Sequence, residues 1–308
     1  MRRLASAMAP HKQTALSEQA VKPMKEPFPH TMMPRAHHDE VARQNLLTAL
    51  RIHMEDAVYP GDKLVYDQKV RPAFVKAHGR EPATRHEVRQ AMRRESFFQT
   101  WSSLTRLWKD MLWDSVGEIV ERQLPELIER GRLQRGAGGS LRLAPDLPMP
   151  RYYTAVDTHW LPGSYFAELT KDDVYAGAVY DRGGYYVVAG LFGKLAHKID
   201  EARNGFVMDL TSRGAIRFLQ QSYPGFAPRR ILDLGCAIGS STLPYVDAWP
   251  EAEVYGVDLA APQLRYGHAR SESLSRKVHF SQQNAEHTDF PDGHFDLVVT
   301  HALAHETS

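Results

Sequence analysis

Apolar side chains recur at helical spacing in the first part of the chain. From Asp39 onward they stand three or four residues apart, on one predicted helix face: Ala42, Leu46, Leu50, Met54 and Ala57. Tyr59-Pro60-Gly61 is predicted to end this helix, because proline and glycine both disfavour its continuation. A second helix is predicted over residues 66–76. A third is predicted from Thr84, with Glu87 three residues later as its capping box.

The strongest helical pattern covers residues 97–124. Its stripe includes tryptophans at positions 101, 108 and 113, which we interpret as core residues rather than an aromatic pocket. The pattern therefore predicts a helical N-terminal domain at residues 38–130. Residues 1–37 are rich in Met, Pro, His and Lys without periodicity, and are predicted to be a disordered tail.

The helical pattern is lost over residues 131–205, which are expected to form a linker followed by a cap segment. Residues 131–150 carry four glycines and three prolines, as linkers do. The stretch 152–193 is dense in glycine and tyrosine, including Tyr165, Tyr175, Tyr180, Tyr185 and Tyr186. Two interpretations stay open: a cap whose phenols reach a substrate, or a packed connection whose tyrosines anchor at the surface.

Short apolar runs separated by turns dominate residues 206–308. After a helix predicted at 211–222, strands are predicted at 231–234, 254–257, 278–282 and 295–299. A helix is predicted to follow the second strand, because Pro262 suits a first helical turn. Strands alternating with helices predict an α/β fold, a Rossmann-like doubly wound sheet with about four strands, preceded by the α-helical domain.

The turn after the first of these strands predicts a nucleotide site. Gly235 and Gly239 bracket it, and Asp258 ends the next strand, where an acid can accept hydrogen bonds from ribose hydroxyls. The dinucleotide pattern G-x-G-x-x-G is not met, because Ala237 and Ser240 stand at its second and third glycine positions. A phosphate-binding P-loop is also absent from the sequence. These spacings favour a ligand with ribose but without pyrophosphate.

The run Asp233-Leu234-Gly235-Cys236-Ala237-Ile238-Gly239 resembles the first motif of class I S-adenosylmethionine-dependent methyltransferases. The resemblance covers residues 229–306, about a quarter of the chain, and includes the run F-P-D-G-x-F-D-L-V-V at 290–299. It implies S-adenosyl-L-methionine as cofactor. The residues that it implies for cofactor binding are Asp233, Gly235, Ala237, Gly239, Asp258, Leu259, Asn284 and Ala285. Most members have Gly at the position of Ala237.

His301 and His305 are candidate general bases, because they follow the fourth strand at the edge where α/β sites open. With 15 histidines in the chain, a role as bystander is also open. The two stand four residues apart before Glu306, but a third metal ligand is not evident in the sequence. No metal site is therefore predicted.

The residues after the fourth strand narrow the acceptor. Methyltransferases of exocyclic base amines carry an Asn/Asp-Pro-Pro-aromatic run there, whereas this chain has Thr300-His301-Ala302-Leu303. Arginine methyltransferases place two glutamates in this loop, and this chain has Glu306 alone. The chain thus resembles the small-molecule branch, similar to ubiquinone/menaquinone-type enzymes that methylate carbon or oxygen. The alternative is a module that binds adenosylmethionine but is catalytically silent, or a truncated fragment that needs a partner.

The resembling domain has seven strands in the family, ordered 3-2-1-4-5-7-6. With four strands recognised, we expect a domain that is incomplete at its C-terminus, little activity of the chain as given, and an open sheet edge. Such an edge invites self-association or a partner chain.

Charge and cysteine content add little to this prediction. Residues 1–110 carry a net charge of +7 and the remainder −6, which sum to the chain's +1. A basic front half could favour an anionic partner, but solvated or mutually attracting halves explain it better, and a nucleic acid is not favoured. The single cysteine fits a reducing compartment, so a cytoplasmic location is expected. No apolar run reaches the roughly 18 residues of a membrane span.

Overall fold

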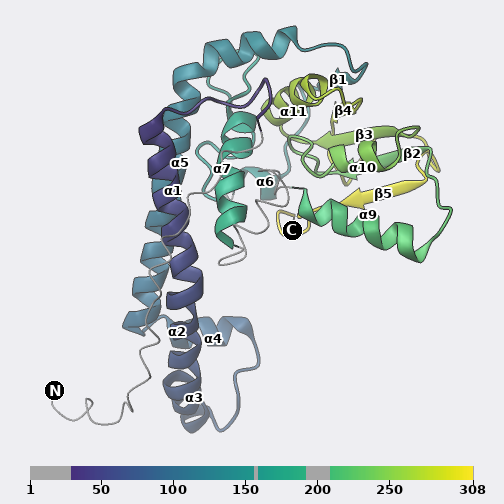
Figure 1. Cartoon of the computed structure of the whole chain (residues 1–308). Coiled ribbons are helices and arrows are strands. Elements are labelled where there is room, and N and C mark those ends of the chain that lie inside the picture. The colour runs from purple at the N-terminus through teal and green to yellow at the C-terminus, as the bar shows by residue number, and fades with distance from the viewer. Residues whose placement is uncertain (1–28, 156–158, 192–208, 308) are drawn as a thin grey trace.

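The computed structural model of the chain describes residues 29–155, 159–191 and 209–307. An elongated helical part lies beside an α/β part that carries a parallel sheet (Figure 1). The expected tail up to residue 28 and the expected cap between 192 and 205 lie outside the described residues. No helix within those described ranges is long and apolar enough to cross a membrane.

The first helical run does not stop at Tyr59-Pro60-Gly61. It passes through α1 (His38–His53), the π-helical η1 (Met54–Val58), α2 (Tyr59–Val65), η2 (Tyr66–Val70) and α3 (Arg71–His78). Each proline stands in the first turn of an α segment just after a π turn, so its missing N–H interrupts little. The run ends at Gly79, whose φ of 69° suits glycine.

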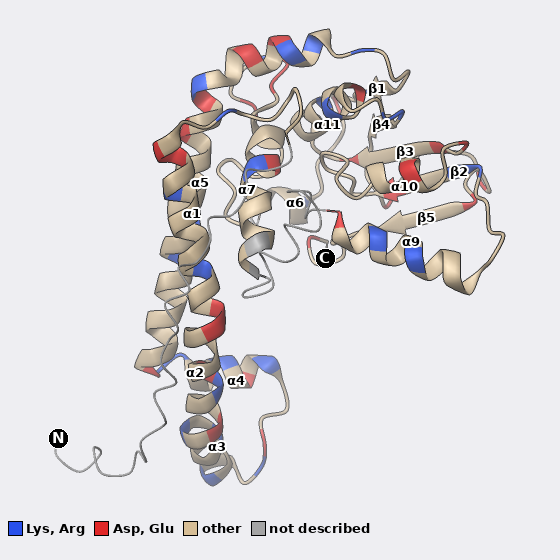
Figure 2. Cartoon of the chain, in the orientation of Figure 1, with Lys and Arg blue, Asp and Glu red and all other residues tan. Residues whose placement is uncertain are grey.

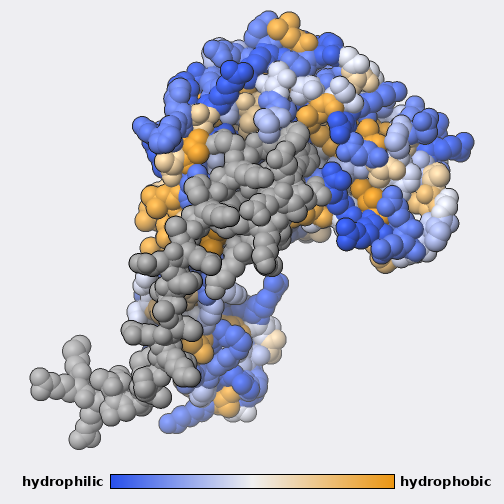
Figure 3. Space-filling view, in the orientation of Figure 1, coloured by the Kyte–Doolittle hydropathy of each residue, from blue (hydrophilic) through white to orange (hydrophobic). Residues whose placement is uncertain are grey.

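The predicted face of the first helix is partly wrong. Leu46 and Leu50 are exposed, whereas Gln44, Leu47 and Ile52 are buried. Gln44 is buried because its Oε1 accepts a hydrogen bond of 2.8 Å from the equally buried Arg182. A polar residue with such a partner is invisible to a hydrophobicity pattern. Figure 3 shows apolar side chains at the surface of this helical part.

Two further helices follow as the sequence predicts. In α4 (Arg85–Met92), Thr84 Oγ1 accepts from the Glu87 backbone N–H at 3.2 Å, which confirms the N-cap half of the predicted capping box, and Glu87 Oε2 accepts from the Ala83 N–H at 2.7 Å. The long helix α5 (Ser96–Leu133) extends beyond the predicted residue 124 and contains Pro125. Trp108 is buried and donates to the Leu47 carbonyl at 2.7 Å, as a core residue should.

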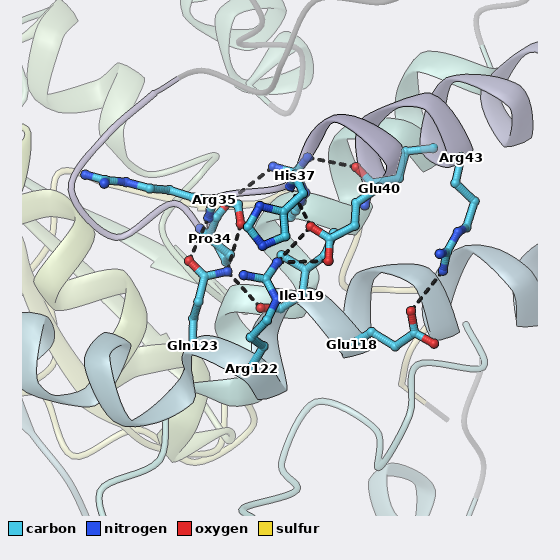
Figure 4. Close-up of polar contacts among 11 residues, drawn as sticks. Pro34, Arg35, His37, Glu40, Arg43, Glu118, Ile119, Arg122 and Gln123 are labelled. Atoms are coloured by element: carbon cyan, nitrogen blue, oxygen red, sulfur yellow. Dashed lines mark hydrogen bonds and ion pairs between the residues drawn. The ribbon is translucent and has the colours of Figure 1, made fainter.

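The expected tail is too long, because residues 29–37 pack against the helices. Met32 is fully buried. The amide of Gln123 on α5 binds both backbone groups of Arg35, at 3.0 and 2.9 Å (Figure 4). Beside it, Arg122 pairs with Glu40, which also accepts from the His37 N–H (Figure 4). These contacts fix the segment that enters α1.

The described residues of the stretch expected as linker and cap include β1 (Ser140–Arg142), α6 (Arg151–Ala155) and α7 (Tyr175–Leu191). The carboxylate of Glu272 accepts from the N–H groups of Ala137 and Gly139, both at 2.8 Å. This turns the glycine loop so that β1 runs beside β4. Helix α7 packs against α1 and α5, so one core cluster joins the helical part to the α/β part.

The sheet is entirely parallel, with the order β1-β4-β3-β2-β5. The elements from residue 209 onward are α9 (Leu210–Ser222), β2 (Arg230–Leu234), α10 (Leu243–Ala248), β3 (Glu253–Asp258), α11 (Ala261–Ser273), β4 (His279–Gln282) and β5 (Leu297–Thr300). The predicted α/β class and the order of the four predicted strands are confirmed. Among the described strands, β5 pairs with β2 alone, and Val298 on it is half exposed. Association through this edge stays a prediction.

Basic and acidic residues are interspersed along the helices (Figure 2). Several cations of the basic front half have partners within the helical part, including Arg43 with Glu118 and Arg71 with Glu81. This supports the interpretation that the charge imbalance is largely neutralised within the chain or solvated.

Candidate functional site

A pocket of about 340 Å³ opens where the strands of the α/β part end and the helical part begins. Its wall from the α/β part includes six of the predicted cofactor residues: Gly235, Ala237, Asp258, Leu259, Asn284 and Ala285. The facing wall is aromatic and comes from α5, α6, α7 and the loop between the last two: Trp113, Tyr152, Tyr153, Tyr165 and Tyr180. One wall of the pocket thus consists of loop backbone and polar side chains, and the other wall is aromatic.

The tight turn after β2 forms part of the wall from the α/β part. The N–H groups of Gly235 and Cys236 both bond the Val257 carbonyl of β3, at 2.9 and 3.0 Å. Gly235 and Ala237 have φ of 73° and 45°, in the left-handed region that favours glycine. The backbone of Ala237 is therefore strained, because a residue with a Cβ stands where resembling sequences carry glycine.

Asp258 holds this turn to the end of β3. One carboxylate oxygen accepts from the Ala237 N–H and the other from the Ala260 N–H, each at 2.9 Å. Burial raises the pKa of Asp258, although these backbone hydrogen bonds favour the charged form. Each oxygen keeps a further lone pair, so the carboxylate can bind hydroxyl donors in the pocket.

Two predicted cofactor residues, Asp233 and Gly239, do not line the pocket. Asp233 is fully buried, and its Oδ2 accepts from the hydroxyls of Ser241 and Thr242, each at 2.7 Å. Those hydroxyls therefore hold the turn, and α10 begins directly after them at Leu243. Gly239 has a φ of 78°, and a Cβ on it would lie 3.0 Å from the Phe280 ring. The left-handed backbone and the nearby Phe280 ring together favour glycine there.

Replacing Asp233 by Asn is expected to remove a pH-dependent loss of stability. Burial raises the pKa of Asp233 to about 6, from an ordinary 3.8. The folded chain therefore keeps a proton that the unfolded chain releases, and the free energy of unfolding falls as the pH rises through this window. A difference of about two pKa units is worth about 3 kcal/mol. Asparagine keeps an oxygen for both hydroxyls without the charge.

Thermal or urea unfolding at pH 4 to 7 measures the effect. The stability of Asp233→Asn relative to the natural chain should grow with pH up to about 6 and then level off. A difference that does not change with pH would contradict the buried, raised carboxyl.

Asn284 and Ala285 follow β4 and border the pocket beside Leu259. The Asn284 Oδ1 accepts from the Glu286 N–H at 2.9 Å, which fixes the orientation of its amide. The Leu259 carbonyl accepts from the Gln282 side chain at 2.9 Å, so the loops after β3 and β4 are joined. Together they form one rigid side of the pocket.

Both candidate bases, His301 and His305, line the pocket. His301 Nε2 lies 2.9 Å from the Tyr245 hydroxyl, and burial lowers the pKa of His301. Its imidazole is therefore neutral near pH 7 and able to accept a proton. His305 Nε2 lies 3.0 Å from His159 Nε2 and 3.2 Å from Glu306 Oε1.

The tyrosines of the expected cap bear out the pocket interpretation only in part, and those buried in the core are not anchored at the surface as the other interpretation requires. Tyr165 and Tyr180 line the pocket, whereas Tyr185 and Tyr186 are buried in the core cluster. Tyr153 also lines the pocket although no sequence motif marked it, and its buried hydroxyl has no hydrogen-bond partner among the described residues. His159 lines the pocket as well, but it stands far from the other site residues in the sequence, so that spacing gave no signal for it.

Residues 231–308 match a family model described as a methyltransferase domain. The chain is 40% identical over 73 residues to demethylmenaquinone methyltransferase from Thermus thermophilus, covering 24% of this chain and 33% of that protein. It is 33% identical over 112 residues to a probable chloroplastic tocopherol O-methyltransferase from Oryza sativa, covering 33% of this chain and 31% of the relative. A trans-aconitate 2-methyltransferase from Rhodopseudomonas palustris is 44% identical over 62 residues, which are 20% of this chain and 24% of that protein.

The chain thus spans about a third or less of the length of these curated relatives. Among solved structures, the adenosylmethionine-bound amino pentose methyltransferase CalS10 from Micromonospora echinaspora is 22% identical. The match covers 32% of this chain and 37% of that one, with a TM-score of 0.27.

Proposed function

We propose that this chain, whose residues 231–308 match a methyltransferase family model, is a class I S-adenosylmethionine-dependent methyltransferase that transfers a methyl group to a carbon or oxygen atom of a small molecule. One observation carries the proposal. The turn, the strand-end acid Asp258 and the loop at Asn284 line one side of a pocket whose other side is aromatic. A nucleoside on the first side would present its reactive group to a molecule held by the second.

The cofactor residues take distinct roles in this proposal. Asp258 accepts the ribose hydroxyls, and Asn284 accepts from the adenine amino group. The cofactor can approach the backbone closely at Gly235 and Ala237, since both residues line the pocket and have little or no side chain. Asp233 and Gly239 hold the turn but do not line the pocket. They affect cofactor binding only by fixing the conformation of the turn.

Methyl transfer is an in-line displacement at the sulfonium methyl. The acceptor's electron pair forms the new bond to the methyl carbon, and the carbon–sulfur bond pair stays on sulfur, giving neutral adenosylhomocysteine. Alignment of the two reactants is worth up to roughly 7–11 kcal/mol. An acceptor hydroxyl or acidic C–H must lose its proton, which neutral His301 can take, with His305 as the second candidate base.

The wall of the pocket favours an aromatic or largely apolar acceptor. Tyr153 and Tyr165 are mostly buried, and burial raises the pKa of both phenols, so each stays a hydrogen-bond donor at neutral pH. Tyr153 has a hydroxyl still to be satisfied. A small ring with one oxygen substituent fits this chemistry.

Titration calorimetry with S-adenosylmethionine, S-adenosylhomocysteine and NAD tests the cofactor. Binding of the first two and not of NAD supports the proposal, and binding of NAD alone overturns it. Transfer of labelled methyl groups to phenols, hydroquinones and carboxylic acids then tests the reaction. Binding without any turnover would favour the alternative of a silent module.

His301→Gln tests the base. We expect kcat to fall by roughly 10²- to 10⁴-fold while the Kd for adenosylmethionine is unchanged, because His301 would act only on the acceptor's proton. The lower pH limb of the kcat profile should disappear with it. An unchanged profile would transfer the role to His305.

A further inference from the structure

Three side chains of metal-ligand type converge at the rim of the pocket. His159 comes from the loop before α7, and His305 and Glu306 come from the residues after β5. His159 Nε2 lies 2.7 Å from Glu306 Oε1, and the other two separations in this triangle are 3.0 and 3.2 Å. The sequence alone indicated only His305 and Glu306, because His159 lies 146 positions before His305.

Hydrogen bonds among these three atoms cannot satisfy all of the close contacts at once. Each Nε2 carries at most one hydrogen, and an ionised Glu306 oxygen carries none. If both histidines donate to Glu306, their nitrogens face each other at 3.0 Å with no hydrogen between them. If one donates to the other histidine, it no longer donates to the carboxylate.

A shared cation satisfies all three atoms together. Zinc lies about 2.0–2.2 Å from His nitrogen and carboxylate oxygen, which places neighbouring ligand atoms about 2.9–3.4 Å apart at octahedral to tetrahedral angles. The observed separations of 2.7–3.2 Å are close to that range. Two imidazoles and one carboxylate also suit zinc, iron or cobalt better than magnesium, which prefers oxygen ligands.

Surrounding groups hold the three ligands in place. The Trp113 indole donates to the His159 carbonyl at 3.1 Å, which ties that loop to α5. The Tyr165 hydroxyl donates to Glu306 Oε1 at 3.2 Å. Such outer contacts orient the ligands of protein metal sites. The side chains of His159 and His305 are 35% and 48% exposed, so a metal ion can reach them from solvent.

We propose that His159 Nε2, His305 Nε2 and Glu306 Oε1 bind one divalent transition-metal ion of the zinc class, with an open coordination position toward the pocket. All three residues line that pocket. An oxygen of the acceptor is the natural ligand for the open position, where the metal would favour its deprotonated form. This second part rests on the proposed methyl transfer, whereas the metal site does not.

The test uses the full 308-residue chain, treated with a chelator and dialysed. Titration calorimetry with Zn²⁺ and visible spectroscopy with Co²⁺ should show about one equivalent bound, with d–d bands in the cobalt form. His159→Ala and Glu306→Gln should each weaken Zn²⁺ binding at least tenfold. His38→Ala is the matched control, because its side chain is 96% exposed and far from this cluster in sequence, and it should bind as the natural chain does.

Absence of one-equivalent binding, or equal binding by all variants, would overturn the site and leave a proton-sharing cluster. The cobalt spectrum of the natural chain decides this even if a variant misfolds. Adenosylmethionine binding is measured separately on the metal-free chain. Metal binding without cofactor binding would refute the proposed function and keep the site. Full methyl transfer by the chelated chain would overturn the metal's part in the reaction.

Discussion

Asp258→Ala is expected to weaken the binding of S-adenosylmethionine by roughly ten- to a hundredfold. The carboxylate borders the pocket, and hydrogen bonds to a charged acceptor contribute about 1.5–3 kcal/mol. The same carboxylate also holds the N–H groups of Ala237 and Ala260, so its loss loosens the turn as well. Calorimetric Kd values for the natural and variant chains measure the combined effect.

Asp258→Asn separates the two contributions. An asparagine oxygen can still accept one backbone N–H, but the amide nitrogen cannot accept a ribose hydroxyl. The other backbone N–H then faces an amide nitrogen, so we expect a loss of thermal stability that is smaller than in Asp258→Ala, with most of the loss in affinity. Glu253→Gln is the matched control, because this acid stands at the opposite end of the same strand and is exposed. A natural Kd in Asp258→Asn would refute the ribose role.

Asp181→Ala is expected to lower the free energy of unfolding by about 3–5 kcal/mol, as does the removal of one partner from a buried ion pair. Asp181 lies on α7 and is buried. Its Oδ2 is 2.9 Å from His30 Nε2, accepts from the Tyr266 hydroxyl at 2.9 Å, and pairs with Arg270 at 3.2 Å. Without it, a buried guanidinium and two polar groups lose their shared acceptor.

The pH dependence gives this prediction a second readout. Burial raises the pKa of Asp181, but the charge of Arg270 and the hydrogen bonds from His30 and Tyr266 outweigh it, and the pKa falls to about 2. A depressed carboxyl pKa stabilises the fold above the ordinary value of 3.8, and this stability is lost as the pH falls toward 2. The natural chain should therefore lose more stability on acidification than Asp181→Ala does.

Asp172→Ala is the matched control for these urea titrations. Asp172 pairs with Arg132 at 2.9 Å, but both side chains are about half exposed, so we expect a change below about 1 kcal/mol. An equal loss of the free energy of unfolding in Asp181→Ala and Asp172→Ala would show that the burial of the Asp181 cluster contributes nothing to stability.

Local sequence signals determined the features that depend on neighbouring residues. Gly235 and Asp258 mark a strand-turn-helix-strand unit, and the order of the four parallel strands is the one implied by the resemblance that these residues carry. Thr84 and Glu87 specify a helix start through their own hydrogen bond. The side chains needed for these features lie close together in the chain, so a pattern of residue types is sufficient to predict them.

The tertiary structure decided which side chains meet across long separations. Gln44 is buried because Arg182 is its partner, and residues 29–37 are ordered because Gln123 binds their backbone. The position of β1 depends on Glu272, and the convergence of His159 with His305 depends on how the helical part packs against the sheet. A hydrophobicity pattern does not predict such polar pairs. It assigns a polar residue to the surface, whereas a distant partner can satisfy the hydrogen bonds of that residue in the core.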